Sequence, residues 1–115
     1  MSTRCLIGIM NHDTQTIQAN YCHFDGYPSN MLPKLKALTP GAIQALTQGN
    51  SIVSLKKQPP ERTDEADLHT LDMTQSPLSL PFWCSYVYAY NPNTKGWTVY
   101  NAHGNVIQSD DLPND

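Results

Sequence analysis

Charged side chains are scarce in this sequence. Asp, Glu, Lys and Arg make up 15% of the 115 residues, whereas an average soluble domain contains about 25%. The seven basic residues are dispersed, and the close pairs among them are Lys34 with Lys36 and Lys56 with Lys57. Contact with a nucleic-acid backbone requires clustered lysine and arginine. The composition therefore argues against binding to extended nucleic acid.

Long apolar runs and patterned cysteines are missing too. The apolar segment from Cys5 to Met10 is far too short for a helix that crosses a membrane, and no small-residue cleavage site follows it at a suitable distance. The three cysteines, Cys5, Cys22 and Cys84, form no Cys-x-x-Cys pair. An odd number of unpatterned cysteines fits free thiols in a reducing compartment better than a secreted disulfide scaffold. We therefore expect a cytoplasmic protein with no membrane contact.

The chain has the usual length of a single domain, and we predict one domain over residues 1–115. Residues 56–81 combine prolines and acidic residues with few apolar ones, which predicts a long polar loop or a short irregular helix around 65–71. The acidic end, from about residue 108 to 115, is predicted to be a flexible tail.

The sequence from Cys5 to Phe24 predicts a β-hairpin with a turn centred on Asp13. We favour a register that pairs Cys5 with Tyr21, because it brings the apolar residues of both strands to one face. A slip of one residue would instead place Cys5 opposite Cys22. The residues assigned to that shared face are Cys5, Ile7, Ile9, Ile17, Ala19 and Tyr21.

Two helices are expected next. Ser29 or Asn30 is the predicted N-cap of a helix that runs to about Leu38, with Pro33 tolerated in its first turn. Thr39-Pro40 opens the second helix, which ends at Gly49. The apolar segment 52–55 is predicted to form a helical turn under the sheet.

A second hairpin is predicted near the end of the chain. Residues 82–90 are rich in aromatic and β-branched side chains, and a strand from Trp97 to Tyr100 returns after a polar loop. A short third segment, Val106-Ile107, can add to the same sheet. The predicted fold is α+β: an antiparallel sheet of two β-hairpins with a helix pair packed on one face, in the order ββααββ.

The run from Tyr21 to Ser29, Tyr-Cys-His-Phe-Asp-Gly-Tyr-Pro-Ser, resembles a family of small, mostly uncharacterised phage and prophage proteins. Residues 1–7 and 46–55 are also similar to the family, whereas Phe24 replaces a usual tryptophan and the second half lacks the family's Asp-Arg-Gly-Glu run. The resemblance covers about the first half of the chain. It implies a phage or prophage accessory protein, located in the host cytoplasm, and implies no activity.

A cysteine nucleophile is one interpretation of this run. The base must lie within hydrogen-bond reach of the thiol, but Cys22 and His23 are adjacent on a strand and point to opposite faces. His23 and Asp25 share a face, so Asp25 could orient His23 while Cys5 or Cys84 supplied the thiol. The alternative, which we favour, is a buried Cys22 that packs as a small apolar residue, with Asp25-Gly26 forming a turn.

Metal binding is disfavoured by spacing. Structural zinc sites usually contain ligand pairs two to four residues apart, and here the candidate ligands are dispersed. No metal or other cofactor is therefore expected. The candidates considered are Cys5, Cys22, Cys84, His23, His69 and His103.

The aromatic residues of the second hairpin carry the binding hypothesis. Tyr86, Tyr88 and Tyr90 alternate along one strand, and Trp97 and Tyr100 lie on its partner. An open sheet face covered by tyrosine and tryptophan is typical of a protein–protein contact. The alternative is that about half of these aromatics pack under the helices.

The sequence thus favours a non-enzymatic binding protein of phage or mobile-element origin, for example an inhibitor of a host defence system that occupies a host protein or a small signalling ligand. A homodimer is compatible with the same surface. The alternatives are a small hydrolase or transferase that uses His23, Asp25 and a thiol, and a virion or structural component. The candidate binding residues are Tyr86, Tyr88, Tyr90, Trp97, Tyr100, His23, Asp25 and Tyr27.

Overall fold

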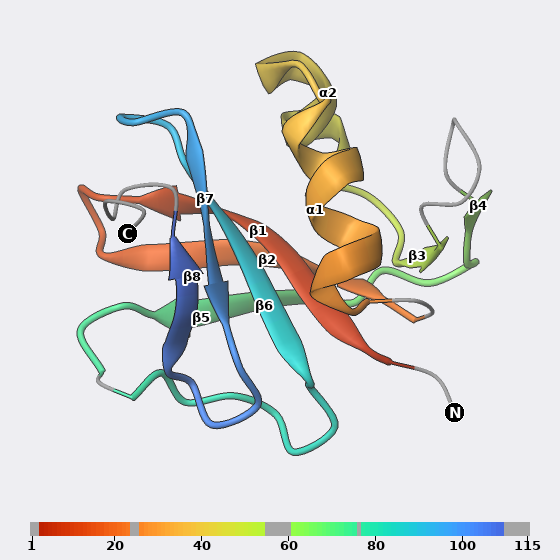
Figure 1. The fold of residues 1–115 in the computed structure, drawn as a ribbon. Helices are drawn as coiled ribbons and strands as arrows, with labels where there is room; N and C mark the ends of the chain where they lie inside the picture. Colours follow the sequence, from red (N-terminus) through yellow and green to blue (C-terminus); the bar gives the residue numbers. More distant parts are fainter. Residues whose placement is uncertain (1–2, 24–25, 55–60, 76, 110–115) are drawn as a thin grey trace.

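The computed structural model describes residues 3–23, 26–54, 61–75 and 77–109. Within these residues, two helices lie on one side of a twisted sheet (Figure 1). The elements are β1 (Cys5–Asn11), β2 (Thr16–Cys22), α1 (Pro28–Lys36), α2 (Pro40–Leu46), β3 (Ile52–Ser54), β4 (Glu61–Arg62), β5 (Leu68–Asp72), β6 (Tyr86–Asn91), β7 (Gly96–Tyr100) and β8 (Val106–Ser109).

The sheet is mixed, so the α+β class is confirmed but the antiparallel sheet is wrong. Its strand order is β4-β3-β2-β1-β6-β7-β8, and β5 also pairs with β2. The two hairpins join through β1 and β6, which run parallel. A parallel pairing requires a long connection between the strands, and here that connection contains both helices and β3 to β5. As a result β1 is an inner strand with both faces buried, as its continuous apolar run allows.

The first hairpin forms, but its predicted register is wrong. Cys5 pairs with Cys22, and residues 12–15 connect the strands. Our prediction placed the apolar residues of both strands on one shared face. Cys5 and Ile7 instead face the helices, whereas Leu6 and Met10 face the opposite core together with Ile17. Because both faces of β1 pack against a core, the apolar pattern could not distinguish between the two registers.

Helix α1 begins earlier than predicted. Tyr27 is its N-cap residue and Pro28 its first helical residue, whose fixed φ suits that position. Pro33 consequently lies inside the helix rather than in its first turn. Asn30, predicted as a cap, instead accepts a hydrogen bond from Lys34 Nζ at 2.8 Å.

Helix α2 begins where the sequence predicts. The Thr39 hydroxyl accepts a hydrogen bond from the Ala42 backbone N–H at 3.2 Å, and Pro40 is the first helical residue. The helix ends at Leu46, before Gly49, which has a φ of +81°. The apolar faces of both helices pack on the sheet.

Three short strands correct the prediction for the middle of the chain. The expected helical turn at 52–55 is replaced by β3, which runs parallel to β2. The expected polar loop at 56–81 contains β4 and β5, and the alternative helix at 65–71 is wrong because β5 pairs antiparallel with β2. Leu71 is the one fully buried residue of β5, so the strand lacks an apolar alternation that would reveal it. Residues 55–60 and 76 lie outside the described part of the chain.

The second hairpin, β6 and β7, is confirmed, and β8 adds the short third strand. Strand β6 begins at Tyr86 rather than at Phe82, whose side chain is fully exposed. The tail predicted from residue 108 overlaps β8, which extends to Ser109, and residues 110–115 lie outside the described part.

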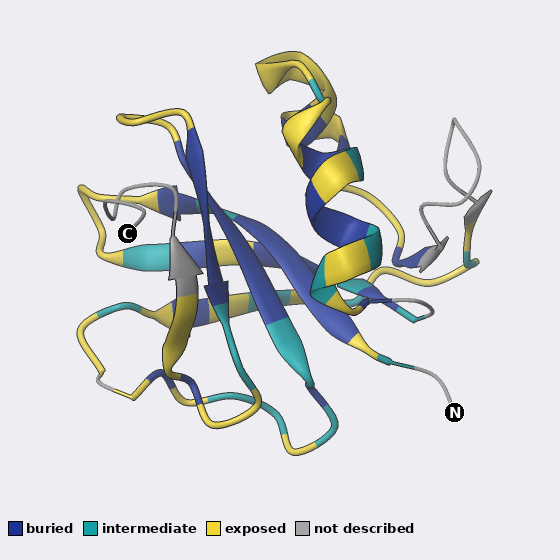
Figure 2. Ribbon diagram, in the orientation of Figure 1, coloured by how far each residue is buried: buried dark blue, intermediate teal, exposed yellow. Residues whose placement is uncertain are grey.

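The sheet separates two cores, and the buried residues follow β1, β6, β7 and the inner sides of the helices (Figure 2). On one face, Met31, Leu35 and Ile43 from the helices pack against the sheet. On the other face, Leu78 and Cys84 come from the segment between β5 and β6, whose described residues form no helix or strand. Neither helix in the described residues is long and apolar enough to span a membrane.

Candidate functional site

The predicted aromatic surface is largely interior. Tyr88 is 0% exposed, Trp97 3% and Tyr90 8%, and all three belong to the helix-side core. For these residues the alternative, packing under the helices, is confirmed, and an exposed aromatic face is wrong. Tyr86 and Tyr100 are half-buried and pack at the margins of opposite cores. The aromatic side chains of the β6–β7 hairpin therefore belong mainly to the hydrophobic core and do not form an exposed binding surface.

Tyr88 connects this core to the conspicuous Tyr21–Ser29 run. Its hydroxyl donates a hydrogen bond to the backbone carbonyl of Gly26, and burial raises the pKa of Tyr88 well above its usual value. Gly26 also lies close to β1: a Cβ at this position would come within 2.8 Å of Cys5 Sγ. Tyr27 is 41% exposed, and its backbone carbonyl accepts the first hydrogen bonds of α1. These contacts assign Gly26 and Tyr27 a role in the fold.

The described residues contain only part of the proposed catalytic set. His23 Nδ1 shares a hydrogen bond with the Tyr21 hydroxyl, and Asp25, its predicted orienting partner, lies outside the described part of the chain. All three thiols are buried. Burial raises the pKa of the Cys84 thiol to about 12 and also raises that of Cys5, with the neighbouring Cys22 adding to the effect. Buried, protonated thiols are poor nucleophiles.

Two of the metal-ligand candidates, Cys5 and Cys22, pair across β1 and β2. In the part of the chain that the structure describes, His, Cys, Asp and Glu form no group of three that could hold a metal ion. His69, one of the candidates, instead pairs with Asp67, with 2.8 Å between Nε2 and Oδ1. Its ring lies edge-on to Trp83.

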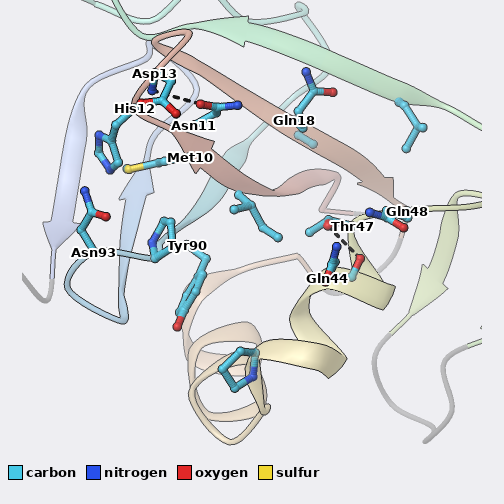
Figure 3. Close-up of a pocket in the computed structure, with 15 residues that line it drawn as sticks. Met10, Asn11, His12, Asp13, Gln18, Gln44, Thr47, Gln48, Tyr90 and Asn93 are labelled. Atoms are coloured by element: carbon cyan, nitrogen blue, oxygen red, sulfur yellow. Dashed lines mark hydrogen bonds between the residues drawn. The ribbon is translucent and has the colours of Figure 1, made fainter.

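A surface hollow that the sequence analysis did not identify is the best-formed candidate site (Figure 3). It encloses about 670 Å³ between the β1–β2 loop, α2 and the end of β6, a volume within the usual range of about 300–1,000 Å³ for small-molecule sites. Ile9, Pro40 and Tyr90 give it an apolar floor. Its polar rim consists mostly of side-chain amides: Asn11, Gln18, Gln44, Gln48 and Asn93.

The loops on one side of this hollow are held by side-chain hydrogen bonds. Asn11 Oδ1, at the end of β1, accepts the backbone N–H groups of Asp13 and Thr14 at 3.0 and 3.3 Å. Across the sheet, His12 Nε2 lies 3.0 Å from Asn91 Oδ1, which also accepts the Asn93 backbone N–H. The β1–β2 and β6–β7 loops are thereby joined along one side of the hollow.

The opposite side is formed by the C-terminal half of α2, and two residues from the sheet hold it in place. The buried Asn20 donates from Nδ2 to the carbonyls of Leu46 and Asn50, at 3.1 and 3.0 Å. The Arg62 guanidinium donates to the carbonyls of Ala45, Gln48 and Asn50, at 2.7 to 2.9 Å. A cation at these carbonyls also complements the negative end of the helix dipole. Gln44, Thr47 and Gln48 therefore line the hollow from a helix end that is fixed to the sheet.

A second hollow of about 470 Å³ adjoins the first and shares Pro40 and Tyr90 with it. Its lining includes Lys36, at the end of α1, and Lys95, in the β6–β7 loop. The Tyr90 and Trp97 rings, with centroids 5.3 Å apart, form its apolar wall. The first hollow is thus lined mostly by amides and includes Asp13, whereas the lining of the second includes two lysines.

Sequence reasoning missed this site because its residues carry no pattern. The amides come from two strands, a helix and two loops, and single Asn and Gln residues are ordinary on any surface. Among the predicted binding residues that the structure describes, Tyr90 alone lines the hollow, but the prediction placed it on an exposed sheet face.

Comparison of the chain with protein-family models, curated proteins and solved structures found no match.

Proposed function

We propose that the protein is a non-enzymatic binding protein whose site is the amide-lined hollow. The observation that carries the proposal is the concentration of five side-chain amides around one apolar floor. A side-chain amide carries both donors and an acceptor, and of these five the Asn11 oxygen is used within the β1–β2 loop. The rim therefore suits a ligand with a polar face that both donates and accepts. A small number of placed polar groups over an apolar surface is typical of ligand sites.

The chemistry of the thiols supports binding over catalysis. A catalytic cysteine needs a lowered pKa and access to its substrate, whereas Cys5 and Cys84 are buried and their pKa values are raised. Alkylation near neutral pH separates the two functions. We expect all three thiols to react slowly in the folded protein and quickly in urea. One rapidly reacting thiol in the folded state would favour the hydrolase or transferase.

In the biological setting suggested by the Tyr21–Ser29 run, the ligand belongs to a host cell. We propose that the protein acts by occupying a small signalling ligand or a segment of a host protein, and thereby inhibits a host defence system. Its action is stoichiometric, because binding alone removes the ligand from its normal target.

Native mass spectrometry of the tagged protein, recovered from the cells in which it naturally occurs, tests this function. We expect a retained mass on the wild-type chain that is lost from the double variant Gln44→Ala, Gln48→Ala. The matched control is Gln75→Ala, an exposed glutamine that does not line the hollow. Recovery of the bare chain alone, or equal retention by the double variant, contradicts the proposal.

A further inference from the structure

The two adjoining hollows form one groove with two chemically different ends. They meet at Pro40 and Tyr90, which line both. The amide-lined end reaches to the β1–β2 loop, and the basic end reaches to the last turn of α1 and to Lys95. A ligand that crosses Tyr90 would contact both ends, so the groove selects for a molecule with two unlike parts.

The first end suits a planar group with alternating donors and acceptors. Asn and Gln side chains can donate and accept at once, which is how they pair with the edges of nucleobases. Gln44 lies on α2 and Gln48 follows shortly after its end at Leu46, and both line the hollow together with Gln18 of β2. Ile9, Pro40 and Tyr90 provide the apolar contact that such a ring needs.

The second end suits an anion. Lys36 and Lys95 lie among its lining residues, and none of the described residues that line it is Asp or Glu. Lysine is a common phosphate ligand, acting as a point charge. The chain contains seven basic residues in all, and two of them line this one small hollow.

We propose that the groove binds a nucleoside phosphate, with the base among the amides of the first hollow and the phosphate at Lys36 and Lys95. This inference rests on the proposed function and names the ligand class for the same site. The sugar crosses Pro40 and Tyr90, where the two hollows meet. The dispersed charge of the rest of the chain restricts the ligand to a mononucleotide or a short oligonucleotide.

The test is an NMR titration of the full-length, ¹⁵N-labelled protein with four ribonucleoside 5′-monophosphates and their parent nucleosides. We expect at least one monophosphate to shift the side-chain amide signals of Gln44 and Gln48 and the backbone signal of Lys95. Loss of the charge-assisted phosphate contact should make the nucleoside bind about tenfold more weakly. Added salt should weaken binding of the monophosphate and leave the nucleoside unaffected.

Substitutions at the two ends of the groove test the two contacts separately. Lys95→Gln should reduce the affinity for the monophosphate toward that of the nucleoside, whereas Lys34→Gln, which removes the same charge from a lysine outside the lining, should leave it unchanged. The double variant Gln44→Ala, Gln48→Ala should weaken both ligands. Its folded state is checked from the dispersion of the remaining backbone signals.

Several results would overturn the inference. No shift with any monophosphate at millimolar concentration excludes the ligand class, and so does equal affinity for monophosphate and nucleoside. If inorganic phosphate binds as tightly as the monophosphates, the groove is an anion site that does not recognise the nucleoside. A short acidic peptide that shifts the same signals while nucleotides do not would assign the groove to a protein segment. In each case a mass retained by the wild-type chain and lost from the double glutamine variant would still support the binding function itself.

Discussion

At the scale of single residues, buried polar groups tie the core to the segment before α1. Tyr88 is fully buried, and its hydroxyl donates to the Gly26 carbonyl. Tyr88→Phe keeps the ring and leaves that carbonyl without its donor, so we expect the free energy of unfolding to fall by about 1–2 kcal/mol. Urea denaturation measures the change. Tyr100→Phe, at a half-buried site, should change stability by less than about 0.5 kcal/mol, and equal losses in both variants would contradict this role of Tyr88.

The buried thiols should make stability depend on alkaline pH. The pKa of Cys84 is raised by burial to about 12, from 9.0 in an unfolded chain, and that of Cys5 is raised as well. Unfolded thiols therefore ionise at a lower pH than folded ones, which favours the unfolded state as the pH rises. We expect these groups to leave the free energy of unfolding unchanged below pH 9 and to lower it between pH 9 and 12.

Urea midpoints measured across this range check the thiol prediction. The variant Cys84→Ala removes one of the titrating groups, so its stability should fall less steeply with pH than that of the wild type. The same slope in both proteins would show that Cys84 ionises equally in the folded and unfolded states.

At the scale of elements, the C-terminal half of α2 depends on Arg62. Its guanidinium donates to the carbonyls of Ala45, Gln48 and Asn50. Because hydrogen bonds to a charged group are stronger than neutral ones, Arg62→Ala should cost about 1–3 kcal/mol of folding free energy. Arg62→Lys should recover only part of this, since one ammonium cannot reproduce the planar fork. Urea denaturation gives the ordering, and equal stability of the alanine variant and the wild type would contradict it.

Alanine variants at two turn glycines distinguish the cost of backbone strain from the cost of steric crowding. Gly49 and Gly104 have φ values of +81° and +82°, but a Cβ at Gly104 would overlap the Leu78 carbonyl, whereas at Gly49 the nearest atom is 3.5 Å away. Gly49→Ala should therefore cost about 1–2 kcal/mol, from the left-handed conformation alone. Gly104→Ala should cost a further 1–3 kcal/mol or so, from overpacking. Thermal or urea unfolding measures both, and similar losses would show that the Leu78 segment moves aside freely.

Local signals in the sequence predicted some elements and not others. The Thr39-Pro40 start of α2 and the β6–β7 hairpin could be predicted, because each depends on neighbouring residues. The predicted start of α1 was too late. Proline suits the first helical position because its φ is fixed, and the preference of Pro28 for that position outweighed the capping tendency of Ser29 or Asn30. Strand β5 was missed because it buries only Leu71 fully.

At the scale of the whole molecule, the pairing of strands that are distant in the sequence determines the sheet topology, which local sequence patterns could not predict. The parallel contact of β1 with β6 buries both faces of β1 and places the tyrosines of β6 under the helices. The aromatic residues that were predicted to form an exposed surface therefore lie largely in the core. The candidate site lies instead in the groove between α2 and the loops. That groove is formed by residues from separate elements, so its amides could be recognised only after the chain was folded.

Binding at the amide-lined hollow can be tested with a single NMR experiment. The ¹⁵N-labelled protein is mixed in turn with the small-molecule and the protein fractions of a lysate of the cells in which it naturally occurs. We predict that one fraction shifts the signals of Gln44, Gln48 and Asn93, which line the hollow. Shifts confined to another surface, such as the exposed Val106 and Ile107 of β8, would contradict the account, as would a spectrum that neither fraction changes.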